Sequence, residues 1–269
     1  MIPRLVATDL DGTIVRSDGT VSVRTLEAIV AVESAGATFV MVTGRPIRWM
    51  HDIAMKTGHR GVAICANGAV AYDLHTETVV RSSLLEPAAA LEVVAALREA
   101  IPGIAFAVER LGSGFAHEPT YVPRWDSADP RATLPIDELL SDGVVKLLAR
   151  HEGVTADELL AAATEAFPSG ATLTHSSADG LLEISGPGVS KASGLAAFAA
   201  DLGVLAADTV AFGDMPNDLP MLAWAGLSVA VANAHPEVLA AADEVTASND
   251  DDGVAQVLSR WFPSATSLR

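Results

Sequence analysis

The chain has 269 residues, of which 50% are apolar and 19% are charged. Such a chain can bury a large core, so general disorder is excluded, and the length suits one large domain or two smaller ones. With 34 acidic and 17 basic residues the net charge is −17, which argues against nonspecific binding to nucleic acid.

Charges interrupt the long apolar stretches, so we expect no membrane-spanning helix. The N-terminus leads directly into a strand-like run and lacks the residue order of a signal peptide. We therefore expect a soluble, cytoplasmic protein, and no feature of the sequence points to a protein partner. The only cysteine, Cys65, excludes an internal disulfide.

The N-terminal part of the chain alternates between short apolar runs and helix-like segments. Strands are predicted over residues 5–10, 37–43 and 62–65, and the helices between them begin at Ser22 and Pro46. This alternation with short connections is typical of a parallel sheet covered by helices.

The same alternation returns near the C-terminus. A helix is predicted over 191–202, and strands are predicted over 209–212, 228–232 and 244–246. The two ends of the chain are therefore expected to form one doubly wound sheet.

The segment between these two parts has a different character. It contains predicted helices over 87–100 and 155–167, and a proline-rich loop runs from Pro119 to Pro135. Further strands are predicted over 104–108, 144–149 and 181–184. The sequence thus predicts an α/β fold, with a Rossmann-like doubly wound parallel sheet core (1–83 and 187–269) and an inserted α+β domain (84–186).

Three polar clusters follow predicted strands of the core. They are Asp9-Leu10-Asp11-Gly12-Thr13, Thr43-Gly44-Arg45 and Gly213-Asp214-Met215-Pro216-Asn217-Asp218. In open parallel sheets, ligands bind outside the carboxyl ends of the strands, so the three clusters are expected to meet in space. Lys191, at the start of a predicted helix, is expected to reach the same edge.

The charges of these residues predict a bound cation. Asp9, Asp11, Asp214 and Asp218 bring four negative charges against one positive charge on Lys191. Carboxylates held that close repel one another unless a divalent cation or a proton is bound. Oxygen ligands favour Mg²⁺, and a proton retained on one aspartate is what a general acid needs.

These clusters, in this order and spacing, resemble the four motifs of the haloacid dehalogenase (HAD) superfamily. The position of the insertion is similar to that in the Cof-type branch, which carries a C2B-type α/β cap, and the stretch Val231-Ala232-Asn233-Ala234-His235-Pro236 also resembles that branch. The match covers most of 1–83 and 183–255, whereas the inserted domain matches only in placement and size.

The resemblance implies a phosphoaspartyl mechanism. Asp9 would be the nucleophile that attacks phosphorus. Asp11 would protonate the leaving alcohol and then deprotonate the hydrolytic water. Thr43 and Lys191 would hold the phosphoryl oxygens.

The resemblance also implies a set of supporting residues. Mg²⁺ would be bound by Asp9, by the main-chain carbonyl of Asp11 and by Asp214. Asp218 would orient a metal-bound water or Lys191. The remaining residues placed around the metal ligands or against the phosphate are Gly12, Gly44, Arg45 and Asn217.

Three further residues are candidates for substrate contact. They are Asn67, which follows the third strand, and Arg124 and Trp125 in the proline-rich loop. The alternatives stay open: local capping for Asn67 and Arg45, and a surface loop with one buried aromatic side chain for Arg124 and Trp125.

The function implied is Mg²⁺-dependent hydrolysis of a small phosphorylated metabolite, such as a sugar phosphate. A phosphomutase is the first alternative, but it needs a basic inserted domain, and residues 84–186 hold few Arg and Lys. A noncatalytic phosphoryl-binding module is the second. A dehalogenase is disfavoured because Asp11 supplies an acid that halide displacement does not need.

Overall fold

The computed structural model describes residues 2–111, 114–124, 133–167, 169–176 and 180–263. The chain divides into two compact units, which we call the core unit (Met1–Arg81 and Ser190–Arg269) and the inserted unit (Ser82–Val189). The predicted insertion, 84–186, lies within the inserted unit. Its assignment as a substrate-selecting cap stays a prediction.

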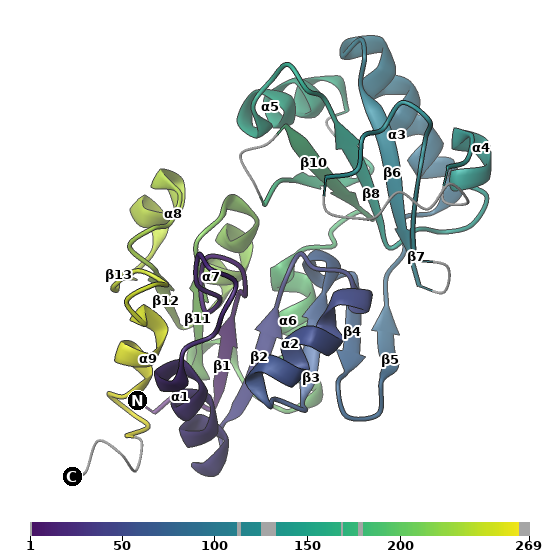
Figure 1. The fold of residues 1–269 in the computed structure, drawn as a ribbon. Helices are drawn as coiled ribbons and strands as arrows, with labels where there is room; N and C mark the ends of the chain where they lie inside the picture. The colour runs from purple at the N-terminus through teal and green to yellow at the C-terminus, as the bar shows by residue number, and fades with distance from the viewer. Residues whose placement is uncertain (1, 112–113, 125–132, 168, 177–179, 264–269) are drawn as a thin grey trace. The chain divides into compact units, whose positions relative to one another are not determined.

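The core unit is built around one sheet (Figure 1). Its strands are β1 (Leu5–Thr8), β2 (Thr38–Val42), β3 (Val62–Cys65), β4 (Val70–Asp73), β5 (Thr78–Ser82), β11 (Thr209–Gly213), β12 (Leu227–Ala230) and β13 (Glu244–Val245). The strand order is β13-β12-β11-β1-β2-β3-β4-β5. The strands from β13 to β3 pair in parallel, and β4 pairs antiparallel with β3.

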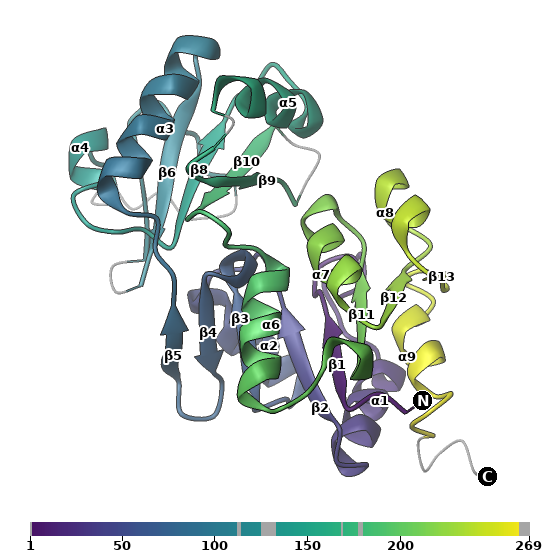
Figure 2. The ribbon, with the colours of Figure 1, turned by 180° about the vertical axis from the view of Figure 1, so that it is seen from behind.

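Helices cover both faces of this sheet. They are α1 (Val23–Ser34), α2 (Met50–Thr57), α6 (Lys191–Asp201), α7 (Leu219–Trp224), α8 (Pro236–Ala241) and α9 (Gly253–Leu258). In Figure 1, α1 and α2 lie in front of the sheet, whereas the reverse view in Figure 2 has α6 and α7 in front. The central strand β1 is therefore buried on both sides, which explains why its first three residues are all apolar. The predicted fold class is confirmed.

Local signals set the helix boundaries as predicted. The Ser22 side chain accepts a hydrogen bond from the Thr25 N–H at the start of α1. Helix α2 ends at Gly58, whose φ of 69° is left-handed. Pro46 precedes a short 3-10 helix (Ile47–Trp49) that leads into α2, so the predicted helix begins with a tighter turn.

The inserted unit has its own sheet and its own hydrophobic core. Its elements are α3 (Pro87–Ala100), β6 (Ala105–Arg110), β7 (Gly114–His117), α4 (Ile136–Leu139), β8 (Lys146–Arg150), α5 (Ala156–Ala166), β9 (Thr172–Thr174) and β10 (Leu181–Ser185). The antiparallel sheet has the order β7-β6-β8-β10-β9. Alternate residues, such as Phe106, Leu147 and Leu182, pack with the apolar side chains of α3 and α5.

Several short elements were not predicted. They are β4, β5, β7, β9, α4 and α7. Every residue of β5 is exposed, and β9 has only three residues, so neither carries an apolar pattern. In the part of the chain that the structure describes, no helix combines the length and apolar character needed to cross a bilayer.

Candidate active site

The polar loops of the core unit meet at the carboxyl edge of the sheet. Asp9 follows β1, Thr43 follows β2, and Asp214 follows β11. Strands β2 and β11 pair with β1 on its two sides, and the chain winds outward from this centre in both directions. Such a switch in strand order opens a crevice at the carboxyl ends of the strands.

Lys191 links two of the carboxylates in this crevice. Its Nζ donates hydrogen bonds to Asp9 Oδ1 at 2.7 Å and to Asp218 Oδ1 at 2.6 Å. Lys191 is 1% exposed, and both carboxylates are also buried. The Ser190 hydroxyl caps α6, so the helix begins at Lys191 and fixes the point from which its side chain extends.

Asp218 uses both of its oxygens within the core unit. Oδ1 accepts from Lys191, while Oδ2 accepts from the backbone N–H groups of Asp214 and Met215, each at 3.0 Å. A Cβ on Gly213 would lie 2.5 Å from Asp218 Cβ, so glycine is required there. Asp218 therefore anchors both the lysine and the loop that carries Asp214.

Asp214 lies against the first motif. Its Oδ1 accepts a hydrogen bond from Thr13 Oγ1 at 2.9 Å. Gly12 has a φ of +79°, and a Cβ on it would lie 2.2 Å from Asp214 Oδ2. Gly12 thus allows the carboxylate to approach the turn after β1. The contact of Thr13 with Asp214 was not predicted, although Thr13 belongs to the first motif.

Burial and mutual repulsion change the ionisation of this cluster. Burial, with Asp218 and Asp214 adding to it, raises the pKa of Asp9 well above its ordinary value despite Lys191. Burial and then Asp218 raise the pKa of Asp214 to about 7. Burial alone would lower the pKa of Lys191, but the charges of Asp218 and Asp9 outweigh it and raise that pKa.

The buried carboxylates fit a hard divalent cation. Asp9, Asp214 and Asp218 each offer an oxygen, and these atoms lie within 4.8 Å of one another. Three carboxylates and the Lys191 ammonium leave two negative charges, which one divalent cation balances. The purely oxygen donor set is the kind that Mg²⁺ binds.

Asp11 lies outside this buried cluster, so the predicted count of four clustered carboxylates is corrected. Its side chain is 56% exposed, and both of its oxygens accept from Arg45, at 2.7 Å from Nε and 2.5 Å from Nη2. Arg45 thus joins the loops after β1 and β2. Thr43 Oγ1 accepts from the Arg45 backbone N–H at 3.1 Å, and Gly44 lies between them in the same turn.

Asn67 and Asn217 lie side by side. Asn217 Nδ2 donates a hydrogen bond to Asn67 Oδ1 at 3.0 Å, and both side chains are buried. Asn217 belongs to the 3-10 turn (Pro216–Asp218) that also carries Asp218. The structure therefore connects the loop after β3 with the loop after β11.

The candidates in the proline-rich loop belong to the inserted unit. The exposed Arg124 has its Nη2 3.8 Å from Glu152 Oε1, a surface ion pair. Trp125 lies outside the described residues. Contact of either residue with substrate stays a prediction.

Two asparagines that were not predicted as site residues support the first motif. Asn233 Nδ2 donates to the Gly12 carbonyl at 2.8 Å, and Asn233 Oδ1 accepts from the Asn249 N–H at 2.9 Å. Asn249 Nδ2 in turn donates to the Val15 carbonyl at 3.0 Å. Asn233 lies in the stretch that resembles the Cof-type branch, but no spacing rule identifies its partner.

Comparison with known proteins agrees with this architecture. The family model described as haloacid dehalogenase-like hydrolase matches residues 6–258. The pyridoxal phosphate phosphatase YbhA of Escherichia coli is 29% identical over 96% of this chain and 98% of its own. The 5-amino-6-(5-phospho-D-ribitylamino)uracil phosphatase YitU of Bacillus subtilis is 30% identical over 97% of this chain and 98% of its own.

A solved structure extends the likeness to three dimensions. A phosphatase of the haloalkanoate (HAD) enzyme superfamily from Bacteroides thetaiotaomicron superposes with a TM-score of 0.80 at 25% identity, covering 97% of this chain and 95% of that one. The chain therefore belongs to the haloacid dehalogenase-like hydrolases, as the sequence motifs predicted. These relatives within the family are named phosphatases.

Proposed function

We propose that the core unit hydrolyses a small phosphomonoester through a phosphoryl group carried by Asp9, with Mg²⁺ bound. The observation that carries the proposal is the buried cluster in which Lys191 bridges Asp9 and Asp218. A lysine placed there neutralises the carboxylate that must approach an anionic phosphate. The coarser activity, phosphate ester hydrolysis, is the one that the names of the relatives describe.

Asp9, Asp214 and the main-chain carbonyl of Asp11 would hold the cation. When bound, the cation supplies positive charge against the phosphoryl oxygens. The raised pKa values of Asp9 and Asp214 support this assignment, because the cluster without a cation retains protons that a cation would displace.

The first step transfers the phosphoryl group to the enzyme. An Asp9 carboxylate oxygen attacks phosphorus, the new O–P bond forms, and the P–O bond to the leaving alcohol breaks in line. For this step Asp11 takes up a proton in place of one of its hydrogen bonds from Arg45 and gives it to the departing oxygen. The half-exposed position of Asp11 supports this role, because an acid at the rim can reach the leaving group.

The second step returns the enzyme to its starting state. Asp11, now a carboxylate, accepts a proton from water as the water oxygen attacks phosphorus. The bond between phosphorus and the Asp9 oxygen breaks, and inorganic phosphate leaves. Arg45 holds both oxygens of Asp11 and would keep this carboxylate oriented between the two steps.

The remaining residues would hold the phosphoryl oxygens while charge shifts during transfer. Thr43 offers a hydroxyl whose oxygen already accepts from the Arg45 N–H, so its proton is directed away from that group. Lys191 offers its ammonium, and Asn217 offers its amide. All three are buried, which strengthens their electrostatic interaction with phosphate.

The relatives support a proposal for the substrate class. Two relatives are named as phosphatases of pyridoxal phosphate and of a phosphoribitylaminouracil, and their sequence matches cover nearly the whole chain. Both names describe a small metabolite with a phosphate ester. We therefore assign this chain a small phosphorylated metabolite and expect the inserted unit to select its leaving group.

The test is phosphate release from p-nitrophenyl phosphate and a panel of sugar, nucleotide and vitamin phosphates. We expect release with Mg²⁺, none with excess EDTA, and a ranking that identifies the leaving group. No release from any member would contradict the proposal. In that case, formation of an aspartyl phosphate without hydrolysis would favour a phosphomutase, and its absence would favour a phosphoryl-binding module.

A further inference from the structure

The loop after β3 has an unusual backbone. Ala66, Asn67 and Gly68 have φ values of 51°, 55° and 97°, so three consecutive residues are left-handed. In the described part of the chain, four non-glycine residues have positive φ, and two of them are neighbours here. Left-handed conformations cost energy for residues with a Cβ and persist where surrounding contacts enforce them.

One of these contacts is the hydrogen bond between Asn67 and Asn217. Asn67 is 2% exposed, and its Oδ1 accepts from Asn217 Nδ2 at 3.0 Å. The buried Asn217 Oδ1 has no hydrogen-bond partner among the described residues. An amide nitrogen carries two hydrogens, so one N–H of Asn217 is used by Asn67 and the other remains for a ligand.

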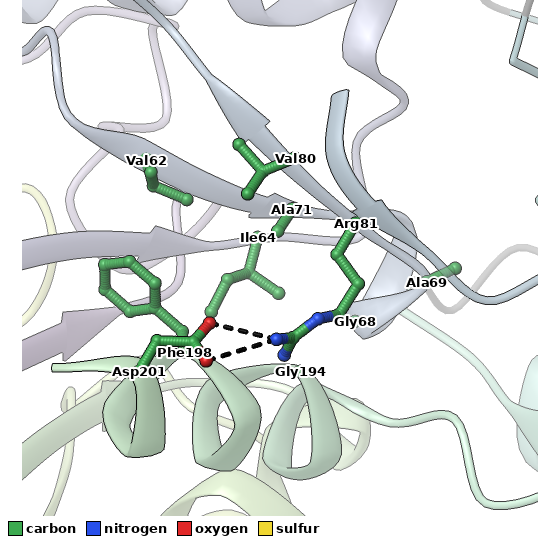
Figure 3. Close-up of a pocket in the computed structure, with 10 residues that line it drawn as sticks. All are labelled: Val62, Ile64, Gly68, Ala69, Ala71, Val80, Arg81, Gly194, Phe198 and Asp201. Carbon is green, nitrogen blue, oxygen red and sulfur yellow. Dashed lines mark hydrogen bonds and ion pairs between the residues drawn. The ribbon is translucent and has the colours of Figure 1, made fainter. Parts of the chain in front are cut away.

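Gly68 fixes the other side of the loop. A Cβ on Gly68 would lie 2.0 Å from the Ser190 carbonyl oxygen, so its backbone is in direct contact with the start of α6. Gly68 and Gly194 also line a cavity of about 190 Å³ between α6 and the strands β3 to β5 (Figure 3). The loop after β2 holds the same backbone, because the Ala66 and Asn67 N–H groups donate to the carbonyls of Arg45 and Thr43 at 2.9 and 3.0 Å.

We propose that Asn67 is a positioning residue that acts through Asn217. Its carbonyl oxygen fixes the Asn217 amide so that the second N–H donates to the phosphoryl group. This inference rests on the proposed function, and it replaces the expectation that Asn67 contacts substrate. The 2% exposure of Asn67 and the use of its Oδ1 by Asn217 support a role behind the ligand.

A double-mutant cycle tests the proposal. Asn67→Gly removes the amide and tolerates a positive φ, and Asn217→Ala removes the amide on which Asn67 acts. We expect Asn67→Gly to weaken binding of inorganic phosphate in the presence of Mg²⁺ about tenfold. In the Asn217→Ala background the same substitution should change the affinity less than twofold. A full tenfold effect in that background, or none in the unaltered protein, would overturn the proposal.

Ala66→Gly is the matched control. It relieves the same backbone strain one residue earlier and leaves the Asn67–Asn217 hydrogen bond in place. We expect it to keep the phosphate affinity within twofold. A loss as large as that of Asn67→Gly would assign the effect to the backbone and contradict the proposal. If thermal unfolding shows that Asn67→Gly does not fold, Asn67→Ala takes its place, because Ala66 already adopts a left-handed conformation in this loop.

Calorimetric titration with inorganic phosphate separates this inference from the proposed function. Binding needs no turnover, so the cycle can be read even when the unaltered protein hydrolyses none of the panel. Phosphate binding without hydrolysis of any panel member would contradict the proposed hydrolysis but not the role of Asn67. Absence of phosphate binding by the unaltered protein would contradict both. When turnover is present, Asn67→Gly should raise KM for p-nitrophenyl phosphate about tenfold in the unaltered protein and less than twofold in the Asn217→Ala background.

Discussion

At the scale of single residues, Lys191 supplies the positive charge that stabilises the buried acidic cluster. Its ammonium lies between two buried carboxylates, and its own side chain is fully enclosed. A buried ion pair contributes little net stability compared with apolar residues, but removing one partner leaves an uncompensated charge. The lysine, which we propose as a phosphate-binding group, is therefore also required for the folded site.

Lys191→Met should keep the length of the side chain and remove the charge. We expect the metal-free variant at pH 8 to lose about 3–5 kcal/mol of the free energy of unfolding, together with its turnover. Urea unfolding measures the first quantity, and phosphate release measures the second. Lys56→Met is the control, because Lys56 Nζ donates to the carbonyl of Gly19 at an exposed position and lies outside the acidic cluster. An equal effect of both substitutions would contradict this role of Lys191.

At the scale of elements, the loop after β3 and the start of α6 work as one unit. Gly68 touches the Ser190 carbonyl, and the next residue along the helix is Lys191. Any displacement of this loop is therefore transmitted to the lysine amine, although Gly68 itself carries no side chain.

Gly68→Ala tests this connection. The new Cβ would meet backbone at 2.0 Å, so α6 must shift, and we expect kcat/KM to fall about a hundredfold. Gly203→Ala is the matched control, since Gly203 also has a positive φ, of 62°, but has no atom within 4 Å of its new Cβ. It should cost about 1 kcal/mol of stability and leave kcat/KM unchanged. Equal kinetics in the two variants would exclude the connection.

At the scale of the whole molecule, the acidic cluster makes stability depend on pH and metal. The pKa of Asp214 is raised from 3.8 to about 7, and that of Asp9 is raised as well. The folded protein therefore retains protons that the unfolded chain has released, so its stability falls as pH rises from about 4 through 7. A bound cation replaces those protons and removes the penalty.

We expect the metal-free protein to melt at a lower temperature at pH 8 than at pH 5.5. Mg²⁺ should raise the melting temperature more at pH 8, and Asp214→Asn should reduce the difference between the two pH values. Asp142→Asn, at an exposed position of the inserted unit, is the control and should leave it unchanged. Calorimetric scans at both pH values, with EDTA or with Mg²⁺, measure these melting temperatures. A metal-free protein that is more stable at pH 8 would contradict the assignment.

The sequence predicted the sheet and the meeting of its loops because buried parallel strands are continuous apolar runs with polar residues at their ends. It also predicted, from helix order, that Lys191 reaches the sheet edge at which Asp9 lies. It did not predict β5, whose residues are all exposed, or the Asn233 and Asn249 contacts. Those contacts join residues more than two hundred positions apart, and no periodic pattern in the sequence predicts them.

The count of charges in the sequence did not predict which carboxylates are buried together. It grouped Asp11 with three other carboxylates, whereas the structure pairs Asp11 with Arg45 at the rim and buries the rest. Burial decides which carboxyls retain a proton, and burial depends on the assembled fold. The residue types of the site were therefore predictable, but their protonation and some of their partners, such as Arg45 for Asp11, were not.

The phosphoryl group on Asp9 is the central claim, and trapping it is the most direct measurement. Asp11→Asn should slow hydrolysis of the intermediate while p-nitrophenolate, a good leaving group, still departs without an acid. Mass spectrometry after brief incubation with p-nitrophenyl phosphate and Mg²⁺ should find one phosphoryl group on the peptide that contains Asp9, and none when Asp9 is also replaced by Asn. Turnover at a near-normal rate by Asp9→Asn alone, with no phosphorylated peptide in either variant, would contradict the account.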